Sequence, residues 1–153
     1  MKHVPILITA ALLAVCVEAS AASTPSTAQL EAHTWKLTRA TDAEGRRIGA
    51  LFVRGRKPYT LHFQHGYMSE WNLCNNVSSQ YRLQGNQLIL ENGIQTTVGC
   101  MRADIVVQQE RAGKLMSSRS AAPTLELDDH GALVLRNAQG DTAVFKPAPL
   151  PAN

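Results

Sequence analysis

The sequence predicts an α+β domain in which a strongly curved antiparallel sheet of seven or eight strands packs on a single helix. Apolar and polar residues alternate with a period of two through much of the chain, as in strands with one buried face. Short segments rich in Gly and Asn separate the alternating runs, as in hairpins. Residues 101–117 instead have a period near 3.6, which is typical of an amphipathic helix.

The first strand is predicted around Trp35, Leu37 and Arg39. A hairpin then joins residues 59–64 to residues 67–73 across His65-Gly66, and a second joins 79–83 to 87–91 across Gly85-Asn86. Segments 124–128, 132–136 and 142–146 predict a closing meander, and residues 50–53 a further short strand. Because such a sheet must cover its apolar face, the helix with Ile105, Leu115 and Met116 is expected to pack against it.

Residues 1–21 have the three regions of a signal peptide: basic Lys2, an apolar core and the small-residue site Ala19-Ser20-Ala21. We expect a mature chain that begins at Ala22 and is periplasmic or secreted, without a transmembrane helix. Leu13-Ala14-Val15-Cys16 offers an alternative, because it is similar to a lipobox that would make Cys16 the lipidated residue of an outer-membrane lipoprotein. Val15 departs from the small residue usual at such sites.

Cys74 and Cys100 are the internal cysteines, and in an exported chain this pair predicts a disulfide. A bond closing a loop of this length contributes roughly 3 to 4 kcal/mol on the chain-entropy model. The spacing differs from the C-x-x-C of redox-active pairs, so we expect a structural bond.

Length and composition predict one domain over residues 29–147, flanked by flexible tails at 22–28 and 148–153. The net charge of +3 is too small to indicate a nucleic-acid partner. We expect a monomer.

Two specific elements surround the cysteines: Cys74-Asn75 and the Thr96-x-x-x-Cys100 that precedes the helix. With them occur Trp35-Lys36-Leu37, Leu61-His62-Phe63, Ser78, Tyr81, Leu88, Leu133-Val134-Leu135 and Phe145. In these residues the chain resembles the META domain, or HslJ-like, family of small bacterial exported envelope proteins. Leu73 and Ser79 stand where the family usually has glycine. The resemblance implies an envelope protein associated with stress response and antibiotic tolerance, and no catalytic mechanism.

Candidate chemistry is sparse. His62 and His65 are three residues apart, so in a strand they point to opposite faces and make poor joint metal ligands. His130 lies in Asp128-Asp129-His130-Gly131, which predicts a turn. No catalytic motif, metal site or cofactor site is found, so we expect a protein that is not an enzyme.

Five cations, with no carboxylate among them, surround the predicted short strand. They are Arg46, Arg47, Arg54, Arg56 and Lys57. Such a patch could bind anionic lipid headgroups or an acidic protein face, although a solvated loop is the simpler interpretation. We therefore expect a binding module of the cell envelope whose partner is an envelope protein or an anionic envelope component. The alternative is a small-ligand carrier or inhibitor with a pocket between sheet and helix.

Overall fold

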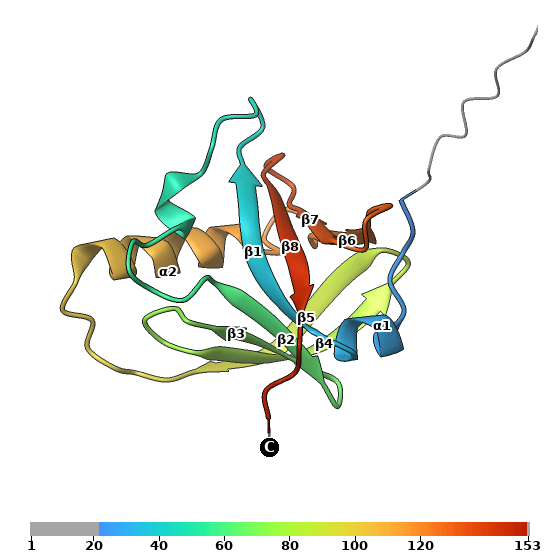
Figure 1. Ribbon diagram of the computed structural model, residues 1–153, viewed down its shortest axis with the longest axis horizontal. Coiled ribbons are helices and arrows are strands. Elements are labelled where there is room, and N and C mark those ends of the chain that lie inside the picture. The colour runs from blue at the N-terminus through green and yellow to red at the C-terminus, as the bar shows by residue number, and fades with distance from the viewer. Residues whose placement is uncertain (1–21, 153) are drawn as a thin grey trace, which may run out of the picture.

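The computed structural model describes residues 22–152, which form a closed barrel of eight antiparallel strands (Figure 1). The strands pair in chain order and the last closes on the first. They are β1 (Thr34–Thr41), β2 (Thr60–Gln64), β3 (Tyr67–Trp71), β4 (Val77–Gln84), β5 (Gln87–Gln95), β6 (Thr124–Leu127), β7 (Leu133–Arg136) and β8 (Thr142–Ala148). The predicted curved sheet is confirmed, and its curvature is strong enough for closure. The predicted leader and Cys16 lie outside the described residues.

The barrel interior is filled with large side chains. Trp35, Tyr59, Phe63 and Phe145 are at most 2% exposed, and they pack with leucines from most strands. The indole Nε1 of Trp35 donates to the carbonyl oxygen of Leu30 at 2.9 Å, so the one polar atom of this side chain is satisfied. Eight strands leave an interior that side chains can fill, and this barrel is of that filled kind.

The β2–β3 hairpin has a two-residue turn at His65-Gly66, as predicted, but β3 does not bury the alternating residues Tyr67, Ser69 and Trp71. Gln64 pairs directly with Tyr67, and because Gln64 is outside, Tyr67 is outside too and 47% exposed. Met68 and Glu70 are therefore the residues that point inward, and both are buried. Alternation favours Tyr59, Tyr67 and Trp71 as core or half-buried residues over an exposed recognition face. In the structure Tyr59 is core, Trp71 is half-buried on the outer surface, and Tyr67 is exposed.

A register shift in β1 has a similar effect. The pairing of β1 with β8 is regular up to Leu37 and resumes at Arg39, which leaves Thr38 as an extra residue. The shift exchanges the two faces, so Arg39 is exposed and Ala40 is buried, whereas strict alternation predicts the reverse.

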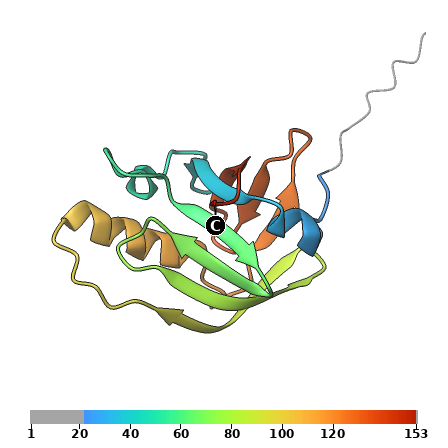
Figure 2. The same ribbon diagram turned by 60° about the horizontal axis from the view of Figure 1, so that its bottom comes forward.

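Three helical elements accompany the barrel. Helix α1 (Thr27–Glu31) begins with a capping box between Ser26 and Gln29, inside a segment expected as partly tail. Residues 49–51 form the 3₁₀ turn η1 (Gly49–Leu51) where a short strand was predicted. Helix α2 (Ala103–Leu115) confirms the predicted helix, two residues shorter at each end. Figures 1 and 2 show α1 and α2 on opposite sides of the barrel.

Helix α2 crosses from β5 to β6, whose pairing is limited to Gln87 with Thr124. Its buried residues Ala112 and Leu115, with Met116 after its end, join the barrel core. Gln108 is 1% exposed and donates to the carbonyl oxygen of Leu51 at 3.0 Å, which attaches the helix to η1. The helix thus completes the core beside the place where the sheet is most weakly paired.

Candidate functional site

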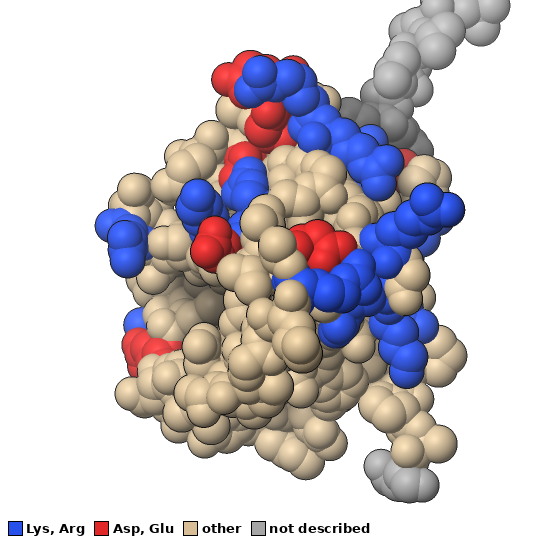
Figure 3. All heavy atoms as spheres, turned by 90° about the vertical axis from the view of Figure 1, so that its left-hand side faces the viewer, with Lys and Arg blue, Asp and Glu red and all other residues tan. Residues whose placement is uncertain are grey.

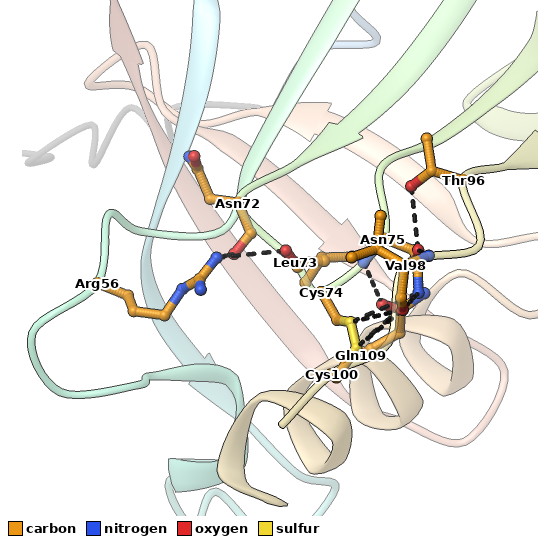
Figure 4. Close-up of a disulfide and its surroundings, with 9 residues drawn as sticks. All are labelled: Arg56, Asn72, Leu73, Cys74, Asn75, Thr96, Val98, Cys100 and Gln109. Carbon is orange, nitrogen blue, oxygen red and sulfur yellow. Dashed lines mark hydrogen bonds between the residues drawn. A yellow bond between two sulfur atoms is a disulfide. The ribbon is translucent and has the colours of Figure 1, made fainter. Parts of the chain in front are cut away.

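The disulfide joins Cys74, just after β3, to Cys100, three residues before α2 (Figure 4). The two Cα atoms lie 6.0 Å apart, within the range that disulfides require. The bond is present where the sequence predicts it, and it attaches the segment that leads into α2 to the end of the first hairpin.

The hydrogen bonds of Asn75 explain why an asparagine follows the first cysteine. Its Oδ1 accepts hydrogen bonds from the backbone N–H of Val98 at 2.6 Å and from the hydroxyl of Thr96 at 3.0 Å. Its Nδ2 donates to the carbonyl oxygen of Val98 at 3.3 Å, so the carboxamide holds both backbone groups of one residue (Figure 4). Its backbone N–H donates to Oε1 of Gln109 on α2 at 2.6 Å.

The most specific motif is therefore a structural clamp. Thr96 and Asn75 hold the loop before α2 next to the disulfide, and Gln109 fixes the helix to the same point. Arg56 adds hydrogen bonds from Nη2 to the carbonyl oxygens of Asn72 and Leu73, at 3.5 and 3.3 Å. Because these polar groups bond to one another, the motif stabilises the corner.

The predicted cationic patch divides into side chains with different partners. Arg46 forms ion pairs with Asp42 at 2.8 Å and Glu44 at 2.9 Å, two carboxylates that precede the cluster in the chain. The guanidinium of Arg47 lies 4.6 Å from the ring centre of Phe52. Arg56 belongs to the disulfide corner. Among the described residues, Arg54 and Lys57 are therefore the members of the patch whose side chains have no ion pair, hydrogen bond or cation–π contact.

Figure 3 shows how charge is distributed on the face formed by the loop before α2 and the start of that helix. Lys and Arg side chains gather along one side of this face, toward the C-terminal segment, and a broad area below its centre has no charge. Several exposed apolar residues belong to the same part of the chain, namely Ile94, Val98, Met101 and Val107.

The histidines lie apart from one another. His62 stacks on Trp71 with ring centres 4.5 Å apart, and burial lowers its pKa, an effect that the Glu31 carboxylate partly opposes. His65 occupies the hairpin turn with φ of 52°. His130 is exposed beside Asp129. Within residues 22–152, no three metal-ligating side chains come together.

One buried acid was not predicted. Glu70 is 5% exposed, and its Oε2 accepts a hydrogen bond from the hydroxyl of fully buried Tyr59 at 2.5 Å. Burial raises the pKa of Glu70 to about 7, although the bond from Tyr59 acts in the opposite direction. Burial and the Glu70 carboxylate raise the pKa of Tyr59 well above its ordinary value. With a two-residue turn at His65-Gly66, Tyr67 lies opposite the outward Gln64. Alternation along β3 then places Glu70 among the core residues.

Two depressions are prominent on the outside of the barrel. The larger, about 820 Å³, lies at the end of α2 and includes Arg111, which forms an ion pair with buried Asp141 at 2.8 Å. The other, about 430 Å³, lies over the outer surface of β1, β2 and β3. Among the helices of residues 22–152, none has the length and hydrophobicity of a membrane span.

The fold and its clamped corner define a small disulfide-linked barrel domain with one main helix. The family model of the META domain matches residues 28–149, so the chain belongs to the META domain family. This confirms the resemblance inferred from the motif residues. No curated protein matches the sequence significantly.

Two solved structures share the fold. An NMR structure of a protein from Burkholderia xenovorans is 18% identical, with a TM-score of 0.63 over 95% of this chain and 99% of that one. A second NMR structure is also 18% identical, with a TM-score of 0.60 over 84% of this chain and 99% of the other. At this identity the likeness concerns the fold alone.

Proposed function

We propose that this protein is a non-enzymatic binding module of the bacterial cell envelope that supports envelope integrity under stress, including antibiotic tolerance. The observation that carries this proposal is the filled barrel, whose large side chains occupy the interior. Because the motif residues around the disulfide bond to one another as well, binding has to use the outer surface. The signal-peptide pattern and the META family membership support an envelope role.

The alternative function, a small-ligand carrier or inhibitor with a pocket between sheet and helix, has less support. Ala112, Leu115 and Met116 belong to the same core cluster as the barrel residues, so apolar side chains occupy that boundary. A carrier of this kind would need a cavity there.

Export is tested by the mass of the protein recovered from its native host. We expect a chain that begins at Ala22 with both internal cysteines oxidised. A diacylated chain beginning at Cys16 would place the same module on a membrane, and an uncleaved chain in the cytoplasm would contradict the envelope role.

Binding is tested by sedimenting the purified mature domain, residues 22–153, with envelope fractions at low and high salt. We expect binding that weakens as salt rises, because the exposed cations of the protein attract anionic envelope components. A cysteine-free variant of the same charge tests whether binding depends on the disulfide. Absence of binding at every salt concentration contradicts the proposal.

In cells, deletion of the gene should lower survival under envelope stress. We expect the full chain to restore survival. Residues 22–153 expressed without the leader should not restore it. Equal restoration by both forms would place the function in the cytoplasm and contradict the proposal.

A further inference from the structure

A row of side chains crosses four strands on the outer surface of the barrel. Lys146 of β8 pairs directly with Lys36 of β1, Lys36 with Thr60 of β2, and Thr60 with Trp71 of β3. Directly opposed residues of antiparallel strands project to the same face. Both lysines are exposed, so the row lies outside the core.

The two lysines are an unfavourable pair in the free protein. Like charges directly opposite each other destabilise a sheet, since their side chains lie close together. Lys57 adds a third cation, because it lines the same depression as Lys36. Within residues 22–152 none of these three lysines forms an ion pair. An anion bound between Lys36 and Lys57 would be attracted by both, and it would offset at Lys36 the repulsion that Lys146 exerts.

The depression beside the row has firm walls. Its volume is about 430 Å³, and Lys36, Lys57 and Trp71 line it together with Pro149 and Pro151 of the C-terminal segment. The hydroxyl of Thr34 donates to the carbonyl oxygens of Ala148 and Pro149, at 3.3 and 3.0 Å, which holds this segment against β1. The segment expected as a flexible tail thus forms one side of the depression.

Trp71 supplies a flat, half-buried apolar surface. Its ring is stacked on His62 at 4.5 Å with an interplanar angle of 27°, so the indole is supported from the side of the sheet. Its Nε1 donates to no described residue. Next to it, Asn72 donates from Nδ2 to the carbonyl oxygen of Pro58 at 2.8 Å and to the hydroxyl of Thr60 at 3.2 Å, while its Oδ1 accepts no bond from the described residues.

The groups that line the depression need different kinds of partner in a ligand. The ammonium groups of Lys36 and Lys57 and the indole N–H can only donate, so they require an acidic or oxygen-rich ligand. The Asn72 Oδ1 requires a donor such as a hydroxyl. A flat aromatic face requires a ring with an apolar side. A sugar ring that carries a carboxylate or a phosphate has all three properties.

We propose that this depression binds an acidic saccharide, with its ring against the indole of Trp71 and its anionic group between Lys36 and Lys57. The proposal deepens the proposed function by naming a ligand class, and it rests on that function for its biological setting. Lys36 and Lys57 line the depression and no carboxylate does, so the local field favours an anionic ligand.

Titration of the purified mature domain, monitored by calorimetry, tests the proposal directly. The probes are tetragalacturonate, which carries carboxylates, glucose 6-phosphate, which carries a phosphate, and neutral maltotetraose. We expect binding of at least one acidic probe and at least about tenfold weaker binding of maltotetraose. The comparison of the two acidic probes identifies which anionic group is preferred.

Variants separate the contributions of the ring and the cations. Trp71→Leu should weaken binding of the acidic probe about tenfold, and Trp71→Phe, which keeps an aromatic face, much less. The pair Lys36→Gln and Lys57→Gln should abolish measurable binding. The matched control is Lys114→Gln with Arg119→Gln, which removes the same charge at the other depression and should leave the affinity unchanged. Urea unfolding of each variant verifies that it is folded.

Three results overturn the saccharide inference: no binding of either acidic probe, equal loss in the control pair, or binding that Trp71→Leu leaves unchanged. Stronger binding to phosphatidylglycerol vesicles than to the acidic probes, insensitive to Trp71→Leu, also overturns it, because a simple lipid-binding patch then suffices. If envelope fractions still sediment the protein after any of these results, the proposed function stands and only this ligand assignment fails.

Discussion

Replacement of Glu70 by Gln tests the interior of the barrel. Burial raises the pKa of Glu70 from an ordinary 4.5 to about 7. The folded protein therefore retains a proton that the unfolded chain has released, so the stability linked to this group is complete below pH 4.5 and is lost as the pH rises through 7. Because one pKa unit corresponds to about 1.4 kcal/mol, the loss between pH 5 and 8 is roughly 2 to 3 kcal/mol.

Gln has nearly the same volume as Glu, does not titrate, and can still accept the hydrogen bond from Tyr59. We therefore expect the difference in unfolding free energy between Glu70→Gln and the wild type to shift by roughly 2 to 3 kcal/mol in favour of the variant from pH 5 to pH 8. The assay is urea unfolding followed by tryptophan fluorescence, to which buried Trp35 responds.

The linkage of His62 to stability has the opposite sign. Its pKa is lowered in the folded state, so its contribution to stability is lost as the pH falls. Taking the difference between variant and wild type at each pH removes this contribution. Glu91→Gln, which makes the same replacement at an exposed residue paired with Arg82, is the matched control. A difference that stays constant from pH 5 to 8 would refute the reasoning about Glu70.

Other predictions concern the disulfide corner and the cationic loop. Cys74→Ser and Cys100→Ser should each lower the unfolding free energy, measured by urea unfolding, by roughly 2 to 4 kcal/mol. The double variant should lose no more than either single variant, because both break one bond. A larger, additive loss would contradict the pairing. Asn75→Ala should cost roughly 1 to 3 kcal/mol with the disulfide intact, because Val98 loses both bonds to the carboxamide; unchanged stability would show that the clamp is dispensable. Replacing Arg46, Arg47, Arg54 and Arg56 by Ser should reduce salt-sensitive binding to anionic vesicles, mostly through Arg54, because the others have protein partners; equal effects of all four single variants would contradict this ranking.

Local sequence signals predicted the hairpins, the helix and the disulfide because each depends on nearby residues. Gly85 has φ of 59°, which the two-residue turn at this position requires, and Gln84 pairs with Gln87 around it. Cys74 and Cys100 needed only the inference of an exported chain. The capping box at Ser26 and Gln29 was also visible, as S-x-x-Q, but the Ser- and Thr-rich composition around it favoured a tail.

The sequence-based predictions failed in two situations. One is where an irregularity decides which face of a strand a residue occupies, and the other is where residues far apart in the sequence come together. The extra residue at Thr38 reverses the faces of β1, and alternation contains no sign of it. The two-residue turn at His65-Gly66 was predicted, but its consequence for β3 was not drawn: the pairing of Gln64 with Tyr67 places Glu70 inside and Trp71 outside. The depression at Lys36 depends on strands far apart in the sequence, β1 and β8 among them, so no local motif could predict it.

The central claim is that this barrel has a filled interior and binds its ligand on the outer surface. Amide and indole chemical shifts of the isotope-labelled mature domain, recorded while tetragalacturonate is added, measure where binding occurs. The account predicts changes at Lys36, Asn72 and the Trp71 indole, with the signals of core residues such as Phe63 and Leu88 unmoved. Changes centred on the core residues and α2 would show binding within the barrel and contradict the account.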